Sequence, residues 1–252
     1  MPGDQDRLIE AVAAANPRTI VVLNTDGPVA TAWLNDVEAV VQAWCGGRGA
    51  GTALAPSCSA TATRPPPGDL PRRRHPGPGT TPATYPGTNG TVAYDEGIAV
   101  GYRFYGARKQ EPRFPFGHGL SCTTTFAHGS MEATYDAAAR QGTVEVTATN
   151  TGLRRGTEVL QVYATLPASA AAEPRRLVAF QKVTLPAAGA KRLSLTIPVE
   201  DLTVWKPGTM TLTPGVHTFA TARSSRVVTA QRATSRSADL RRQRKSGWLI
   251  LV

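Results

Sequence analysis

The chain has 252 residues, with 28 lysines and arginines against 18 aspartates and glutamates, and a net charge of +10. Three unevenly spaced cysteines support neither a disulfide framework nor a paired zinc site, and no apolar run approaches the roughly 20 residues that span a bilayer. The N-terminal residues lack the features of a signal peptide, so we expect a cytoplasmic protein with no membrane partner.

The excess positive charge lies mainly in two segments. Residues 61–80 carry four arginines and one aspartate, and residues 231–245 carry five arginines and one lysine against one aspartate. Both segments have the composition of unfolded chain, whereas a nucleic-acid-binding face is spread over a folded surface, often with aromatic residues among the charges. We therefore expect no specific nucleic-acid partner.

Residues 1–55 have the pattern of an α/β unit. Residues 4–15 show helical periodicity with acidic residues in the first turn. The continuous apolar run Thr19–Asn24 predicts a buried parallel strand. A helix from Thr31 to Asn35, a strand over Ala39–Trp44 and a helix from Gly49 to Leu54 are expected to follow. The alternation implies a doubly wound sheet, but two strands are too few for one, so the unit is interpreted as truncated, with an unpaired edge on its first strand.

Residues 129–228 predict an antiparallel β-sandwich like a fibronectin type III domain. Short runs with apolar residues at every second position are separated by turn sequences such as Asn150-Thr151-Gly152 and Thr213-Pro214-Gly215. The predicted strands are Val144–Asn150, Glu158–Tyr163, Leu177–Phe180, Arg192–Ile197 and Val216–Ala220. The chain is therefore expected to be an α+β protein in two parts, a truncated doubly wound α/β remnant followed by this sandwich.

Several stretches resemble the C-terminal part of glycoside hydrolase family 3 enzymes of the bacterial β-glucosidase kind. The similarity rests on Asn16–Thr25, on Tyr94–Tyr105 (YDEGIAVGYRFY) and on Phe114–Ser121 (FPFGHGLS), in that order, with the sandwich similar to the family's terminal fibronectin type III-like domain. Residues 81–128 then form a connecting segment.

The resemblance implies retaining hydrolysis of terminal β-glycosides, with a β-glucoside or oligosaccharide as substrate and no metal or cofactor. In this family an aspartate nucleophile lies on an N-terminal (β/α)8 barrel, and a glutamate acid/base lies upstream of the part that this chain resembles. A retaining enzyme needs both carboxyl groups about 5–5.5 Å apart. No catalytic, cofactor-binding or metal-binding residue is therefore assigned, and we expect the chain alone to be inactive.

Other residues in this chain do not supply a substitute site. Asp95 and Glu96 are expected to point to opposite faces of an extended segment, with Glu96 anchoring a loop either by hydrogen bonds or by pairing with a nearby arginine such as Arg103. His118, between two glycines, is expected to stabilise a turn. Three histidines have no suitably spaced ligand or triad partner, namely His75, His128 and His217. The glycine-rich run Gly46–Gly51 matches a phosphate-binding loop only weakly. Cys45 and Cys122 stand where relatives carry tyrosine.

Residues 56–80 and 229–252 depart from the family pattern. Residues 56–80 are interpreted either as a disordered linker rich in proline and arginine or as out-of-frame translation. The second interpretation rests on codons for the family's sequence at this place, which give the residues from Pro56 to Arg64 when they are read one frame off. The family frame would be restored by about Thr81. The basic tail 229–252 is interpreted as having a similar, out-of-frame origin.

Two other functions compete with that of an inactive hydrolase fragment. The sandwich could act alone as a carbohydrate-binding or interaction module, which would favour an exposed row of aromatic residues. Of its aromatic residues, Tyr163, Phe180, Trp205 and Phe219 are mostly expected in the core. Alternatively, the chain could be one half of a split enzyme whose barrel comes from an upstream chain.

Overall fold

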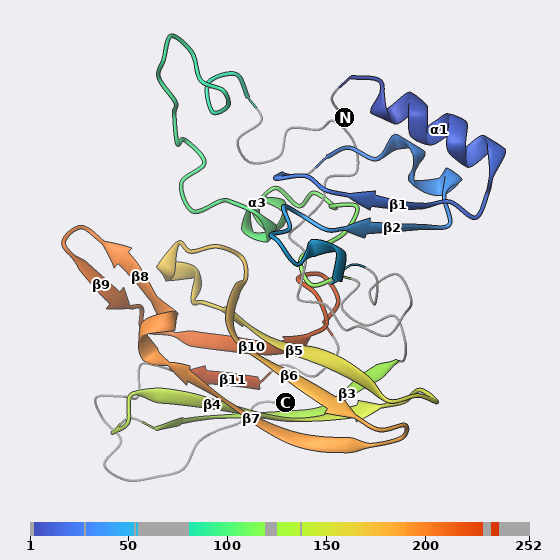
Figure 1. Cartoon of the computed structure of the whole chain (residues 1–252). Helices are drawn as coiled ribbons and strands as arrows, with labels where there is room; N and C mark the ends of the chain where they lie inside the picture. The colour runs from blue at the N-terminus through green and yellow to red at the C-terminus, as the bar shows by residue number, and fades with distance from the viewer. Residues whose placement is uncertain are drawn as a thin grey trace.

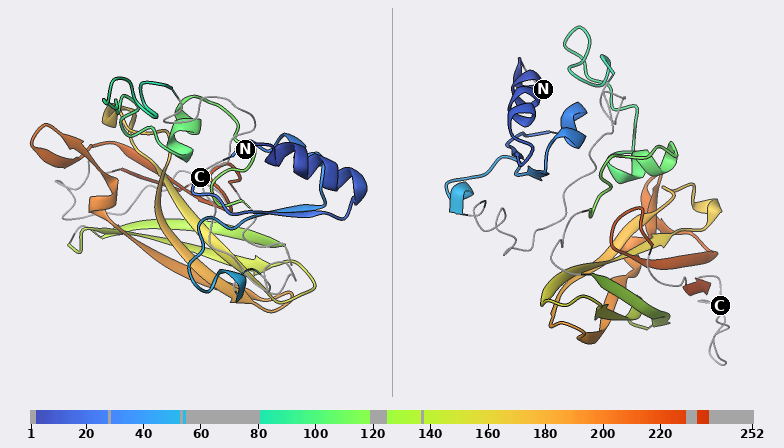
Figure 2. Two further views of the ribbon diagram at one scale, coloured as in Figure 1. Left: turned by 45° about the horizontal axis from the view of Figure 1, so that its top comes forward. Right: turned by 90° about the vertical axis from the view of Figure 1, so that its right-hand side faces the viewer.

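A computed structural model of the chain describes residues 3–27, 29–52, 54, 81–118, 125–136 and 138–228, together with the backbone of 233–236 (Figure 1). The run interpreted as out-of-frame, residues 56–80, lies outside the described residues, as does most of the tail 229–252. The described chain consists of an N-terminal α/β unit, a connecting segment containing the short helix α3 (Tyr102–Ala107), and a β-sandwich. In Figures 1 and 2, α3 lies between the N-terminal unit and the sandwich.

The N-terminal unit has the predicted helix and two parallel strands. Helix α1 (Gln5–Ala15) precedes β1 (Ile20–Leu23), which pairs in parallel with β2 (Ala39–Gln42). The helix expected from Thr31 to Asn35 is a single 3-10 turn, η1 (Ala32–Asp36), which buries Trp33 beneath α1. The Trp33 indole N–H donates to the Asp6 carboxylate of α1 at 2.8 Å. In the described ranges this sheet has two strands, so each has one unpaired edge.

Two antiparallel sheets form the sandwich. One sheet has the strand order β3-β4-β7 and the other β11-β10-β5-β6, and a small hairpin, β8–β9, extends from one end (Figure 1). The strands and intervening 3-10 turns are β3 (Phe126–Asp136), β4 (Gln141–Asn150), β5 (Gly156–Thr165), η2 (Ala168–Ala170), β6 (Arg176–Leu185), β7 (Ala190–Pro198), η3 (Val199–Leu202), β8 (Thr203–Lys206), β9 (Thr209–Leu212), β10 (Val216–Ala222) and β11 (Ala233–Arg236).

The core lies between the sheets and follows the period-two pattern. In β4 every second residue from Gly142 to Asn150 is buried, and in β7 the buried residues are Leu193, Leu195 and Ile197. Strand β5 differs because every residue from Gly156 to Ala164 is buried. One of its faces lines the core, and the connecting segment packs against its other face.

Strands β3, β8, β9 and β11 were not predicted. In β3 the pairing with β4 shifts between His128 and Met131, and this bulge interrupts the alternation of apolar residues on which a strand prediction depends. Strands β8 and β9 have four residues each and are joined by a tight turn at Pro207-Gly208. Strand β3 also begins three residues before the predicted start of the sandwich at residue 129.

The expectation for the aromatic residues is wrong for two of the four. Tyr163 and Phe219 are buried, but Phe180 on the edge strand β6 and Trp205 on β8 are 69% and 68% exposed. Phe180 occupies an outward position of an edge strand, and Trp205 lies on a hairpin that projects beyond the sheets (Figure 1). No helix in the described ranges is long and apolar enough to cross a membrane.

Candidate functional site

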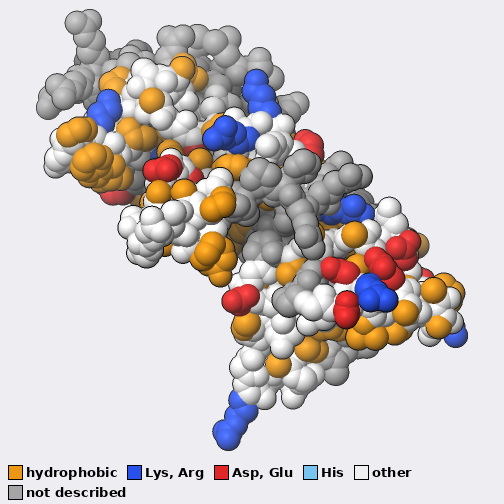
Figure 3. Space-filling view, turned by 90° about the horizontal axis from the view of Figure 1, so that it is seen from above, with side chains coloured by type: hydrophobic (Ala, Val, Ile, Leu, Met, Phe, Trp, Pro, Cys, Tyr) orange, Lys and Arg blue, Asp and Glu red, His pale blue; other side chains and the backbone are white. Residues whose placement is uncertain are grey.

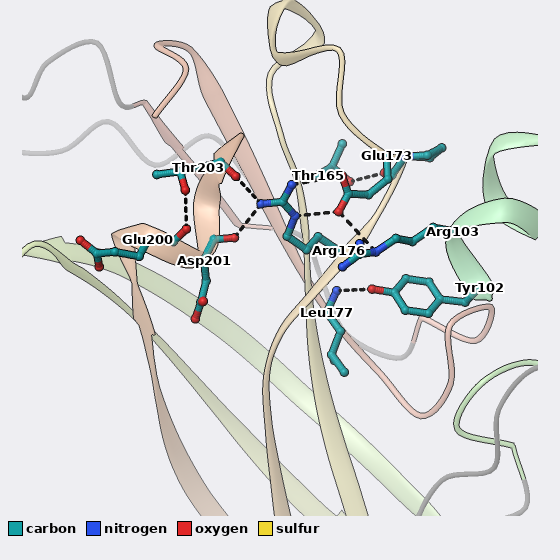
Figure 4. A network of polar contacts seen from close by, with 10 residues as sticks. Tyr102, Arg103, Thr165, Glu173, Arg176, Leu177, Glu200, Asp201 and Thr203 are labelled. Atoms are coloured by element: carbon teal, nitrogen blue, oxygen red, sulfur yellow. Dashed lines mark hydrogen bonds and ion pairs between the residues drawn. The ribbon is translucent and has the colours of Figure 1, made fainter. Parts of the chain in front are cut away.

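The connecting segment is fixed to the sandwich by a buried carboxylate. Glu173 lies just before β6, and its side chain is 2% exposed. Arg176 binds it through two hydrogen bonds, Nε to Oε1 at 2.7 Å and Nη2 to Oε2 at 3.1 Å, and Arg103 of α3 approaches Oε1 at 3.5 Å (Figure 4). Burial alone would raise the pKa of Glu173, but the hydrogen bonds from Arg176 and the two positive charges outweigh it and lower the pKa. Glu173 is therefore an anion with a structural role.

Arg176 also holds the turn that precedes β8. Its Nη1 donates to the backbone carbonyls of Asp201 at 3.0 Å and Thr203 at 2.6 Å (Figure 4). One guanidinium therefore joins the Glu173 loop, β6 and the η3–β8 turn. An arginine can make these contacts together because its donors point in fixed, divergent directions.

Tyr102 covers the outer face of β5. Its hydroxyl accepts a hydrogen bond from the Leu177 N–H at 3.0 Å, and its ring packs edge-on against Tyr163, with ring centroids 5.8 Å apart. Phe116 packs beside the same ring at 5.5 Å. These aromatic contacts explain why β5 is buried on both faces, and they use residues from both motifs, YDEGIAVGYRFY and FPFGHGLS.

The second motif adds backbone contacts to the sandwich. The Ser225 N–H donates to the Phe116 carbonyl at 2.8 Å. Gly117 has a φ of +89°, and a Cβ there would lie 3.0 Å from the Ser224 Cα and collide with the Gln161 side chain. Only glycine fits this position without displacing β5 or the turn after β10.

A second buried ion pair lies within the sandwich. The Glu158 carboxylate accepts from the Val159 N–H at 2.9 Å and pairs with Arg223 at 3.2 Å, and its side chain is 3% exposed. Burial raises the pKa of Glu158, with Arg223 opposing the rise. Burial and the charge of Arg223 lower the pKa of the nearby His128 to about 4, so this imidazole is neutral near pH 7.

A small hollow of about 300 Å³ opens on the outer face of the β5–β10 sheet. Its lining includes Tyr163, Thr165, Thr218 and Arg175, whose guanidinium lies 5.8 Å from the centre of the Tyr163 ring and donates to the Ser225 carbonyl. Among the residues that the structure describes, none that lines the hollow is a carboxylate.

The chain matches two protein-family models. The profile described as the glycosyl hydrolase family 3 C-terminal domain matches residues 1–122, and that of the fibronectin type III-like domain matches residues 158–225. A β-glucosidase from Rhizobium radiobacter is 39% identical over 210 residues, which cover 80% of this chain and 25% of that protein. β-Glucosidase B of Emericella nidulans is 39% identical over 91% of this chain and 29% of its own length. The chain belongs to glycoside hydrolase family 3.

Solved β-glucosidase structures have a similar fold over most of this chain. DesR, a β-glucosidase from Streptomyces venezuelae solved in complex with D-glucose, matches 94% of this chain with a TM-score of 0.82 and 33% identity. β-Glucosidase 3B from Thermotoga neapolitana matches 92% with a TM-score of 0.80 and 29% identity. This chain covers 31% and 34% of those two chains. It therefore corresponds to the C-terminal quarter to third of its relatives.

Asp95 and Glu96 of the YDEGIAVGYRFY motif were expected on an extended segment. They lie instead in a turn. Residues 95–98 form this turn, in which the Gly97 N–H donates to the Tyr94 carbonyl. The expected pairing of Glu96 with Arg103 is also wrong, because Arg103 binds Glu173, 70 positions away. Nothing local in the sequence signals that long-range pair.

The histidines have structural settings. His118 ends the FPFG turn, where its N–H donates to the Pro115 carbonyl at 2.9 Å and its ring lies 5.2 Å from that of Phe114. His128 and His217 are buried in the sandwich. Cys45 is an exposed free thiol, and His75 and Cys122 lie outside the described residues. Among the residues that the structure describes, no group of three or more histidine, cysteine or acidic side chains could hold a metal ion.

One pair of carboxylates does face each other across a sheet. Glu132 of β3 and Glu145 of β4 are directly opposite in register. Arg192 of β7 binds both, at 3.2 Å and 2.7 Å, and all three side chains are solvent-exposed. A bridging arginine on an exposed sheet face leaves neither carboxylate available to attack or protonate a glycoside.

Proposed function

We propose that this chain is the non-catalytic C-terminal part of a β-glucosidase-type enzyme that hydrolyses terminal β-glycosides with retention. The nucleophilic aspartate and the acid/base glutamate would lie outside the chain, so the chain alone has no glycosidase activity. The activity named for the relatives supports the parent reaction.

One observation carries the proposal of inactivity. Glu158 and Glu173, whose side chains are no more than 3% exposed, each pair with arginine, and the facing pair Glu132 and Glu145 shares Arg192. Retaining hydrolysis requires one carboxyl group that attacks and a second that donates a proton, set about 5–5.5 Å apart across a sugar site. The contacts of these four carboxylates support a scaffold role for them.

The test is a hydrolysis assay on the purified chain with a chromogenic β-glucoside. The expected release of chromophore equals that of a boiled sample. Release that exceeds the boiled control and increases linearly with chain concentration would contradict the proposal.

A binding module is the second candidate function, and the hairpin β8–β9 favours it. Trp205 and Met210 are directly opposite in the hairpin register and are 68% and 57% exposed. Opposite residues of an antiparallel pair lie on one face, so these two side chains form a small apolar platform. An aromatic ring on such a platform can stack on a sugar ring.

Sedimentation with insoluble β-glucan distinguishes the two functions. A binding module predicts that the wild-type chain sediments with the glucan, that Trp205→Ala abolishes this, and that Phe180→Ala, which removes an equally exposed aromatic ring from β6, does not. A non-catalytic scaffold predicts that all three proteins stay in the supernatant.

A further inference from the structure

The part of the connecting segment that precedes α3 forms an arm, residues 81–100, that extends away from the sandwich (Figures 1 and 2). Asn89 and Gly90 are the two central residues of a tight turn in this arm. The Thr88 N–H donates to the Thr91 carbonyl at 2.8 Å, and the Thr91 N–H donates to the Thr88 carbonyl at 3.0 Å. Both central residues have a positive φ, +52° and +74°, as in a type I′ turn, for which Asn-Gly is a preferred sequence.

The Asn89-Gly90 pair can rearrange chemically without a catalyst. The backbone nitrogen of the residue that follows an asparagine can attack the side-chain amide carbon, and a side chain on that residue hinders the attack. Gly90 has no side chain, and a Cβ built there would meet no atom within 4 Å. Among the described residues, none accepts a hydrogen bond from the Gly90 N–H. Asn89 is itself exposed, so both reacting groups are accessible to water.

The other four asparagines of the chain each lack one of these features. Asn16 precedes a proline, whose nitrogen carries no hydrogen and cannot attack. The Asn35 side chain accepts a hydrogen bond from Arg113 at 2.9 Å and precedes an aspartate. Asn150 is 0% exposed, and its Nδ2 donates to three backbone carbonyls. Asn24 is exposed but precedes a threonine, whose branched side chain crowds the attacking nitrogen.

We infer that Asn89 is a deamidation site, converted by its own backbone into a mixture of aspartate and isoaspartate. The Gly90 nitrogen gives its proton to water and bonds to the Asn89 Cγ. The Cγ–Nδ2 bond then breaks, and the amide nitrogen takes up a proton and leaves as ammonia. Water opens the resulting five-membered imide. Opening at Cγ gives aspartate, and opening at the backbone carbonyl carbon gives isoaspartate. The site lies beyond the proposed function and does not depend on it.

The turn controls the reaction and is altered by its product. Ring closure rotates the Asn89–Gly90 peptide, so the two hydrogen bonds between Thr88 and Thr91 must open first. A pairing this small is marginal on its own, so local opening costs little. Isoaspartate lengthens the main-chain path by one carbon and breaks the turn, and both products add a negative charge to the arm. The arm lies at the top of Figure 1, the side from which Figure 3 views the molecule, and on that face acidic side chains lie among uncharged ones.

Incubation of the full chain at mildly alkaline pH, followed by complete trypsin digestion and mass spectrometry, tests the inference. Residues 75–103 form one tryptic peptide, in which Asn89 is the only asparagine and glutamine is absent. This peptide is expected to gain, with time, the mass that separates a carboxylic acid from an amide. Its product should split into two chromatographic peaks of equal mass, aspartyl and isoaspartyl. The peptide of residues 19–48, which contains the exposed Asn24, should show no gain over the same period.

Gly90→Ala is the matched variant, because its methyl group hinders the attack while Asn89 remains. It is expected to lose the mass gain, and so is Asn89→Gln, whose longer side chain disfavours ring closure. Urea unfolding followed by tryptophan fluorescence checks that both variants keep the folded sandwich. A wild-type peptide of constant mass would overturn the inference. An equal gain in residues 19–48, or a gain in Gly90→Ala as fast as in the wild type, would overturn it as well.

Discussion

The carboxylate of Glu173 and the guanidinium of Arg176 form a two-bond ion pair, at 2.7 and 3.1 Å, in which the Glu173 side chain is 2% exposed. Arg103, on α3 of the connecting segment, approaches the same carboxylate at 3.5 Å. Breaking a buried pair by removing one partner destabilises a protein because the other charge stays buried without compensation.

Glu173→Gln is therefore expected to lower the free energy of unfolding by about 3 kcal/mol. The loss has two causes, since Arg176 and Arg103 both lose their counter-charge. Urea titration followed by tryptophan fluorescence measures it. Glu200→Gln, which breaks the fully exposed pair of Glu200 with Arg140, is the control and should leave the unfolding midpoint unchanged. Equal effects of the two substitutions would show that Glu173 is not a buried anchor.

Acid should destabilise the sandwich through His128. Its pKa is about 4 in the folded chain and 6.5 when unperturbed, so the unfolded state binds the proton first as the pH falls. The stability that the neutral imidazole contributes is complete above about pH 6.5 and is lost between pH 6.5 and 4, by about 3 kcal/mol in total. His217, whose pKa burial also lowers, acts in the same direction, whereas the raised pKa of Glu158 opposes both.

His128→Gln is expected to flatten the pH dependence of unfolding in this window. Urea midpoints at pH 7, 5.5 and 4.5 give the slope for the variant and the wild type. A wild-type slope that persists in the variant would assign the acid sensitivity to other groups.

Gly117→Ala should separate the connecting segment from β5. The new methyl group would lie 3.0 Å from the Ser224 Cα at a φ of +89°, so the variant combines overpacking with backbone strain. We expect a loss of about 2 kcal/mol or more in unfolding free energy. Gly129→Ala is the control, because a Cβ there meets its neighbours at an ordinary 3.6 Å. Differential scanning calorimetry compares the two, and equal Tm values would contradict the packing of Gly117 described above.

The first strand of the N-terminal unit is expected to promote aggregation. Ile20 and Val22 lie on one face of β1 and are 48% and 41% exposed, and the described sheet has an unpaired edge beside them. Such an edge pairs readily with another chain unless a charge blocks it. Val22→Lys should therefore raise the soluble fraction on expression, whereas Leu153→Lys, at a 96% exposed loop position, should not. No gain from Val22→Lys would show that the edge is not the site of association.

Sequence reasoning found those features whose signal is local. Period-two alternation located β4, β5, β6, β7 and β10, and the apolar run from Thr19 located β1. The bulge between His128 and Met131 hid β3, because a register shift moves the buried positions out of phase.

The site was harder to predict because it is built from long-range contacts. Arg103 meets Glu173 across 70 positions, and Tyr102 meets Leu177 across 75. No local pattern in the sequence encodes either pairing. The turn that holds Asp95 and Glu96 is not predicted for a different reason: this start of the YDEGIAVGYRFY motif is expected to be extended, but Gly97, with a φ of +54°, closes a turn there.

Limited trypsin digestion followed by mass spectrometry tests the central claim most directly, namely that the connecting segment and the sandwich form one folded unit. The arginine-rich run between Arg64 and Arg74 should be cut first. Residues 75–102 contain no lysine or arginine, so the resistant fragment should begin at His75 and keep Arg103 uncut, because its guanidinium is bound to Glu173. Early cleavage at Arg103, Arg108 or Arg113 that leaves the sandwich alone would contradict this account.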